Sequence, residues 1–171
     1  MYKYQFIKKI PKTTMNRYIS KYYALNSEID GKLPADWHPY CWECETNDEY
    51  IDLMDNYFLG EKGILFTKIK FSDSPVYIAT FPRAVVDILY DLIKNNMDIN
   101  KFGRDLKNEF LTEEEQKEMF DLLMEFNKHI NIESYIKNQF PVEYYKMRYI
   151  NAWLSKKKSG NNKRAFAAIW K

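Results

Sequence analysis

The segment from Gly63 to Met97 carries the strongest structural signal in the chain and reads GILFTKIKFSDSPVYIATFPRAVVDILYDLIKNNM. Residues 64–71 are rich in β-branched and aromatic side chains and end in an alternation of apolar with polar residues, which is typical of a strand. Residues 72–75 have turn chemistry, because short polar side chains that bond their own backbone precede a proline. Residues 76–81 have the composition of a second strand. The segment therefore predicts a β-hairpin over residues 64–81.

A helix is expected directly after the hairpin. Pro82 suits the first helical turn, where a missing N–H costs nothing, and Thr80 is placed to cap it. Asp87 and Asp91 lie one turn apart and are expected on the solvated face of this helix rather than as paired catalytic carboxylates. The apolar residues recur at helical spacing and form a broad face: Val85, Val86, Ile88, Leu89, Leu92, Ile93 and Met97.

Weaker patterns predict the elements on either side of this unit. Residues 2–7 alternate apolar with polar side chains, which predicts an N-terminal strand that could join the hairpin. Thr112 and Glu115 form a capping box, the clearest helix start in the chain. Apolar stripes predict longer helices over residues 15–29, 47–59, 113–129 and 141–155, and short ones over residues 104–110, 132–138 and 165–170. The last long helix would carry Val142, Tyr145, Tyr149 and Trp153 on one face.

This order of elements predicts an α+β fold. A mainly helical single domain, residues 1–171, would surround a small antiparallel sheet built on the hairpin. The chain is long enough for a self-sufficient core. An apolar content of 46% with 17% aromatic residues argues against a disordered chain, which needs few aromatics and a high net charge.

Composition also bears on the cellular setting. No apolar run approaches the length needed to cross a bilayer, and the charged first twelve residues do not resemble a secretory signal. Two cysteines in 171 residues make no disulfide framework, which fits a reducing compartment. Lysine outnumbers arginine by 21 to 5, which is typical of an AT-rich genome. We therefore expect a cytoplasmic protein of a bacterium or of a bacteriophage-infected cell, with no membrane partner.

The net charge of +2 conceals an uneven distribution. Residues 1–32 carry +5, residues 33–143 carry −11 and residues 144–171 carry +8. The favoured interpretation is that the basic ends pair with the acidic middle at the surface, where each ion pair is worth only about 0–1 kcal/mol. The alternative is that a basic end binds phosphate groups or an acidic partner.

An irregular aromatic segment, residues 32–47, predicts a contact surface. Two prolines exclude a regular helix there. Tyrosine and tryptophan are favoured as anchors of protein interfaces. The predicted partner-binding residues are Trp37, Tyr40, Trp42, Glu43 and Glu45.

The same segment holds the only metal-like pattern. His38, Cys41 and Cys44 offer imidazole and thiolate ligands, which suit zinc. A structural zinc site needs a fourth ligand, for which Glu43, Glu45 and Asp48 are the nearby candidates. The CxxC spacing also suits a redox pair, although neighbouring carboxylates would raise the thiol pKa. Ordinary, partly buried cysteines are favoured over zinc ligands, and zinc ligands over a redox pair.

The basic C-terminal segment, residues 156–171, is a candidate for nucleic-acid binding, because basic and aromatic side chains together bind phosphates and stack on bases. The candidate residues are Lys156, Lys157, Lys158, Lys163, Arg164 and Trp170. The same segment could instead dock as a helix on the core of this protein, or in a groove of another protein.

The usual catalytic signatures are missing from the sequence, including a glycine-rich phosphate loop, a G-x-S-x-G elbow and an H-E-x-x-H motif. The sequence therefore favours a small non-enzymatic protein-binding module with no cofactor. In a phage or mobile element, such a module would inhibit or regulate a host protein complex. The alternatives are a nucleic-acid-binding accessory protein that uses its basic ends, and a small zinc protein.

Overall fold

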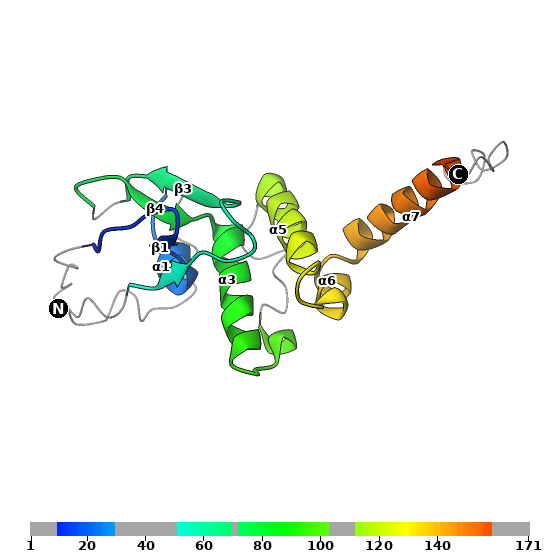
Figure 1. Ribbon diagram of the computed structural model, residues 1–171, viewed down its shortest axis with the longest axis horizontal. Coiled ribbons are helices and arrows are strands. Elements are labelled where there is room, and N and C mark those ends of the chain that lie inside the picture. Colours follow the sequence, from blue (N-terminus) through cyan, green and yellow to red (C-terminus); the bar gives the residue numbers. More distant parts are fainter. Residues whose placement is uncertain (1–9, 30–50, 70–71, 103–111, 159–171) are drawn as a thin grey trace.

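The computed structural model describes residues 10–29, 51–69, 72–102 and 112–158, and these form an α+β arrangement (Figure 1). A four-stranded sheet and helix α1 lie at one end, α3 and α5 lie in the middle, and α6 leads into α7 at the other end. The predicted fold class is confirmed. The expected strand over residues 2–7 and the expected helices over residues 104–110 and 165–170 lie outside the described ranges.

The sheet has the strand order β2-β1-β4-β3. The predicted hairpin is confirmed: β3 (Ile64–Thr67) pairs antiparallel with β4 (Val76–Ala79), and Leu65 lies opposite Ile78. Strand β1 (Arg17–Ile19) pairs antiparallel with β2 (Leu53–Asp55) but parallel with β4. The sheet is therefore mixed, and the expectation of a purely antiparallel sheet is wrong. Parallel pairing is open to β1 and β4 because a long crossover separates them in the chain.

Two of the expected helices are wrong. Residues 15–29 form β1 and then the short helix α1 (Lys21–Leu25), and the second half of the segment 47–59 forms β2. Lys21 interrupts any continuous helix because its φ of 52° lies in the left-handed region. Short apolar runs at mixed spacing suit a strand as well as a helix. Residues 17–19 and 53–55 form strands because they pair with each other.

Helix α3 (Phe81–Lys94) lies at the centre of the core and confirms the prediction in most respects. The backbone N–H of Arg83 donates to the Thr80 hydroxyl, 3.2 Å away, so Thr80 is the cap. The helix ends earlier than its apolar pattern indicated, and Met97 is 58% exposed rather than part of the buried face. A 3-10 turn, η2 (Ile99–Lys101), follows.

Within residues 112–158 the structure describes three further helices: α5 (Glu113–Phe126), α6 (Glu133–Gln139) and α7 (Pro141–Lys158). Helix α5 packs on α3 and buries its apolar stripe of Met119, Leu122, Leu123 and Phe126. The predicted capping box is present, since the Thr112 N–H donates to Glu115 at 2.8 Å and the Glu115 N–H donates to the Thr112 hydroxyl at 3.3 Å. Within the described ranges, each helix is too short or too polar to traverse a bilayer.

Replacing Thr112 with Ala should remove the cap of α5 and lower the free energy of unfolding by about 1 kcal/mol. The physical reason is that the Glu115 N–H loses its acceptor at a helix end where the backbone offers none. Urea unfolding followed by circular dichroism measures the change. Thr112→Ser keeps the hydroxyl, so its free energy of unfolding should differ from that of the parent by roughly a few tenths of a kcal/mol. Equal loss in both variants would contradict the capping role.

Candidate interaction site on helix α7

The residues that the sequence marked as functional lie almost wholly outside the described ranges. This holds for the predicted partner-binding residues Trp37, Tyr40, Trp42, Glu43 and Glu45, for His38, Cys41 and Cys44, and for Lys163, Arg164 and Trp170. Lys156, Lys157 and Lys158 end α7, and nothing is described of their side chains. All of these assignments stay predictions. Among the side chains that the structure does describe, no group of three or more His, Cys, Asp or Glu could hold a metal ion.

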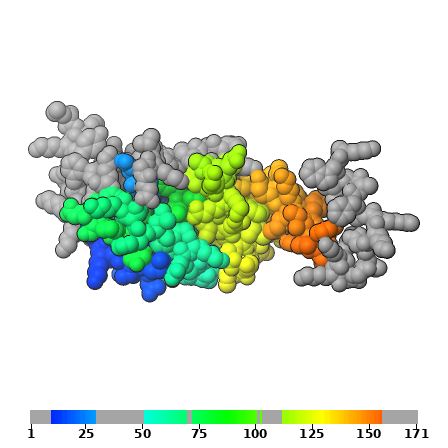
Figure 2. Space-filling model, turned by 90° about the horizontal axis from the view of Figure 1, so that it is seen from above, coloured from blue at the N-terminus to red at the C-terminus, as the bar shows by residue number. Residues whose placement is uncertain are grey.

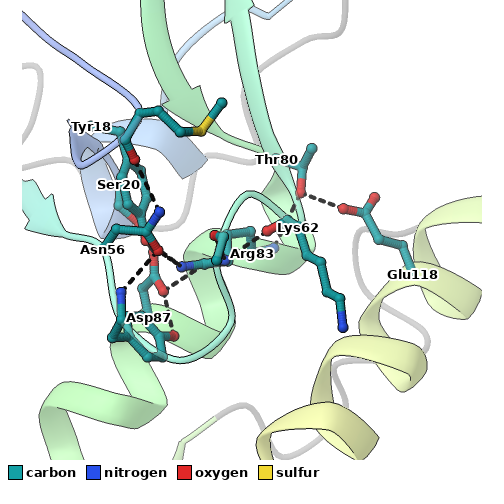
Figure 3. Close-up of polar contacts among 11 residues, drawn as sticks. Tyr18, Ser20, Asn56, Lys62, Thr80, Arg83, Asp87 and Glu118 are labelled. Carbon is teal, nitrogen blue, oxygen red and sulfur yellow. Dashed lines mark hydrogen bonds and ion pairs between the residues drawn. The ribbon is translucent and has the colours of Figure 1, made fainter.

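A buried polar network surrounds Arg83 and Asp87 on α3 (Figure 3). Both side chains are 0% exposed, and Arg83 Nε donates to Asp87 Oδ1 over 2.9 Å. The remaining guanidinium N–H groups donate to the backbone carbonyls of Gly60 (3.1 Å) and Lys62 (2.6 Å), and to the Tyr18 hydroxyl (2.7 Å) and the Asn56 side chain (3.5 Å). All five donors of this guanidinium are therefore used.

Asp87 collects hydroxyl donors from several elements. Tyr18 on β1, Ser20 at the start of α1, and Tyr57 after β2 donate to its carboxylate over 2.8, 2.6 and 2.6 Å. Burial, with the negative charge of Asp87 adding to it, raises the pKa of the Tyr18 and Tyr57 phenols, so both stay protonated as donors. The expectation that Asp87 lies on the solvated face of α3 is wrong.

The closed hydrogen bonding of this network fits a structural role. The Arg83 donors are used by side chains of the network and by the backbone carbonyls of Gly60 and Lys62, and Arg83 and Asp87 are fully buried. Figure 3 shows that it joins β1, the segment after β2 and α3 in one place. The sequence held a signal for it, because Arg83 and Asp87 stand four residues apart in the first half of α3, whose other residues there are apolar.

Helix α7 presents the other unusual feature, a set of apolar side chains in contact with solvent. In the space-filling view, α7 lies at one end of the described part of the molecule, beyond α5 and α6 (Figure 2). Five large apolar residues are exposed there: Val142 (52%), Tyr145 (52%), Tyr149 (74%), Ile150 (57%) and Leu154 (42%). We call these five residues the α7 apolar surface.

The first two turns of α7 attach it to the body through a polar clamp. Tyr144 is 3% exposed, and its hydroxyl donates to the Glu133 carboxylate on α6. Arg148 Nη1 donates to the Tyr144 hydroxyl over 3.1 Å, and Lys137 Nζ lies 3.0 Å from Glu133 Oε1. The hydrogen bonds from Tyr144 and Lys137 hold the pKa of Glu133 below its usual range. The clamp therefore fixes the base of α7 and leaves the apolar surface uncovered.

The predicted helix over residues 141–155 is confirmed, but its apolar face does not pack on the core. Of the four residues on that face, Val142, Tyr145 and Tyr149 are exposed, and Trp153 is half-buried. From Tyr145 to Ser155 every described residue is exposed or half-buried. An isolated helix shorter than about 12–15 residues is marginal in water, because most helical stability in proteins comes from packing an apolar face. The part of α7 from Tyr145 to Lys158 is about that length, and its large apolar side chains are exposed instead of packed on the described part of the protein.

Comparison with known proteins supplies no relative from which function could be transferred. No family model, curated protein or solved structure matches the chain.

Proposed function

We propose that this protein is a non-enzymatic protein-binding module that binds its partner through α7. The observation that carries the proposal is the α7 apolar surface. Among the described residues, the polar contacts of α7 with α6 include those of Tyr144 and Arg148 in its first two turns. Large apolar side chains that gather on one exposed element mark interaction sites far more often than apolar residues scattered singly.

The spacing of the exposed residues supports a helix-in-groove mode of binding. Val142, Tyr145 and Tyr149 follow one another at intervals of three and four residues, the spacing by which an amphipathic helix places anchors in a groove. Tyrosine is enriched among residues that carry most of the binding energy of an interface. Tyr149 is the most exposed of the three, and we assign it the role of central anchor.

A module of this kind acts by occupying a surface rather than by changing a bond. In a bacterial or phage-infected cell it would regulate or inhibit the protein complex that it binds. Nucleic-acid binding is the weaker candidate. A nucleic acid is bound by aromatic rings that stack on its bases and by cations that pair with its phosphates. Aliphatic side chains such as Val142, Ile150 and Leu154 serve neither purpose.

The proposal predicts site-specific cross-linking at Tyr149. A photoreactive phenylalanine analogue placed there should, in the cells that naturally produce the protein, give an adduct with one other protein. The analogue at Phe66, which is 61% exposed on β3, is the matched control and should give none. Val142→Gln combined with Tyr145→Gln should lower the yield at position 149 about tenfold or more, because interface anchors each contribute above about 1 kcal/mol. Both residues are exposed, and Tyr145 gives up its ring contact with Tyr144 at 5.5 Å, so the free energy of unfolding should fall by about 1 kcal/mol or less.

Other outcomes would contradict the proposal in identifiable ways. An adduct that nuclease treatment removes would favour nucleic-acid binding. Equal yields from positions 149 and 66 would indicate non-specific contact, and a yield unaffected by the double substitution would show that the apolar surface is not the contact.

A further inference from the structure

Lys146 interrupts the α7 apolar surface. It stands four residues after Val142, three before Tyr149 and four before Ile150, so all three are its neighbours on the helix surface. Its side chain is exposed, and it forms no ion pair within the described part of the chain. Any partner that covers Val142, Tyr149 and Ile150 together must therefore also enclose or border this ammonium group.

Covering a lysine has an energetic consequence for the partner. An ammonium group that loses water without gaining an opposite charge is strongly unfavourable, whereas a carboxylate at hydrogen-bond distance offsets much of the loss. The charge around the site also favours an acidic partner surface, since residues 144–171 include eight basic residues and no acidic one. Opposite potentials across an interface also speed encounter and exclude wrong partners.

We infer that the partner of α7 presents an apolar groove with at least one carboxylate positioned to pair with Lys146. This inference rests on the proposed function and names the chemistry of the partner. Pairing of α7 with the α7 of a second copy does not fit, because it would bring basic residues against basic residues: the helix holds one acidic residue, Glu143, against five basic ones. We assign the acidic apolar groove to another protein, and a second copy that receives α7 on its acidic residues 33–143 is a distinct outcome of the test below.

Charge reversal at Lys146 tests the inference in the full-length protein. With the photoreactive analogue at position 149, Lys146→Glu should reduce the protein adduct about fivefold or more, because an attraction becomes a repulsion. Lys146→Arg keeps the charge and should retain most of the yield. Lys94→Glu makes the same charge change at an exposed residue at the far end of α3, and it should leave the yield unchanged.

The possible outcomes separate this inference from the proposed function. If Val142→Gln with Tyr145→Gln abolishes the adduct but Lys146→Glu does not reduce it, α7 docks through apolar contacts alone. The inference that the partner places a carboxylate beside Lys146 is then wrong. If neither change affects the adduct, the proposed function fails as well. If Lys94→Glu lowers the yield as much as Lys146→Glu, the effect is one of overall charge, and the local pairing is rejected. An adduct at twice the mass of the chain would identify a second copy and overturn the choice of partner.

Discussion

Arg83→Met should lower the free energy of unfolding by about 3–5 kcal/mol. The substitution leaves Asp87 buried with hydroxyl donors but without its counter-charge. It also leaves the carbonyls of Gly60 and Lys62 without the guanidinium that they accept from. An unpaired buried charge costs far more than the net contribution of the intact pair, so the loss should exceed that of an ordinary core substitution. Urea unfolding followed by circular dichroism measures it.

Arg17→Met is the matched control for this change. Arg17 also pairs with an aspartate, Asp55, at 3.9 Å, but their side chains are 64% and 87% exposed. Solvent screens such a pair, and its loss should cost less than about 1 kcal/mol. Similar losses for the two variants would contradict the structural role of the buried network.

A milder change keeps the prediction testable if Arg83→Met does not fold. Tyr57→Phe removes one donor to Asp87 while keeping the ring that stacks on Tyr90 at 4.4 Å. It should cost about 1–3 kcal/mol, because a buried carboxylate oxygen loses a hydrogen bond. No measurable loss would show that Asp87 does not depend on this donor.

Gly63→Ala should destabilise the protein by about 2–4 kcal/mol, from two causes that add. The φ of Gly63 is +71°, in the left-handed region where a side chain costs about 1–2 kcal/mol. A Cβ at this position would also lie 2.7 Å from the Cβ of Arg83, which cannot move aside as the tip of a flexible side chain can. Thermal or urea unfolding gives the size of the loss.

Gly60→Ala separates the two causes. Gly60 has a similar φ of +61°, but an added Cβ would meet nothing within 4 Å. It should therefore cost only the backbone term of about 1–2 kcal/mol. The difference between the variants reports the close approach of Gly63 to Arg83, and equal losses would show that α3 shifts to accommodate the new methyl group.

The sequence determined the hairpin, α3 and α5, because each has a local cause within its own residues. The turn chemistry of residues 72–75 brings β3 and β4 together. Thr80 caps α3, and Thr112 with Glu115 caps α5, through side chains that reach only a few residues along the chain. Such signals are readable without knowledge of the rest of the molecule.

The tertiary structure alone decided the elements whose partners are distant in the chain. Residues 17–19 and 53–55 become strands because they pair with each other, although their apolar spacing also suits helices. Asp87 is buried because Tyr18, Ser20 and Tyr57 bring hydroxyl donors to it. Its pairing with Arg83 was readable from their spacing of four residues, but its burial depends on residues that lie 30 to 69 positions away in the sequence.

The candidate site divides in the same way. The sequence determined that α7 would be a helix with Val142, Tyr145 and Tyr149 on one face, since a helical period places them there. Whether that face packs on the core or meets solvent depends on where the chain turns after α6. There the clamp of Glu133, Tyr144 and Arg148 holds the base of α7 and leaves this face exposed. Local spacing specifies which residues share a face, and only long-range packing specifies what that face contacts.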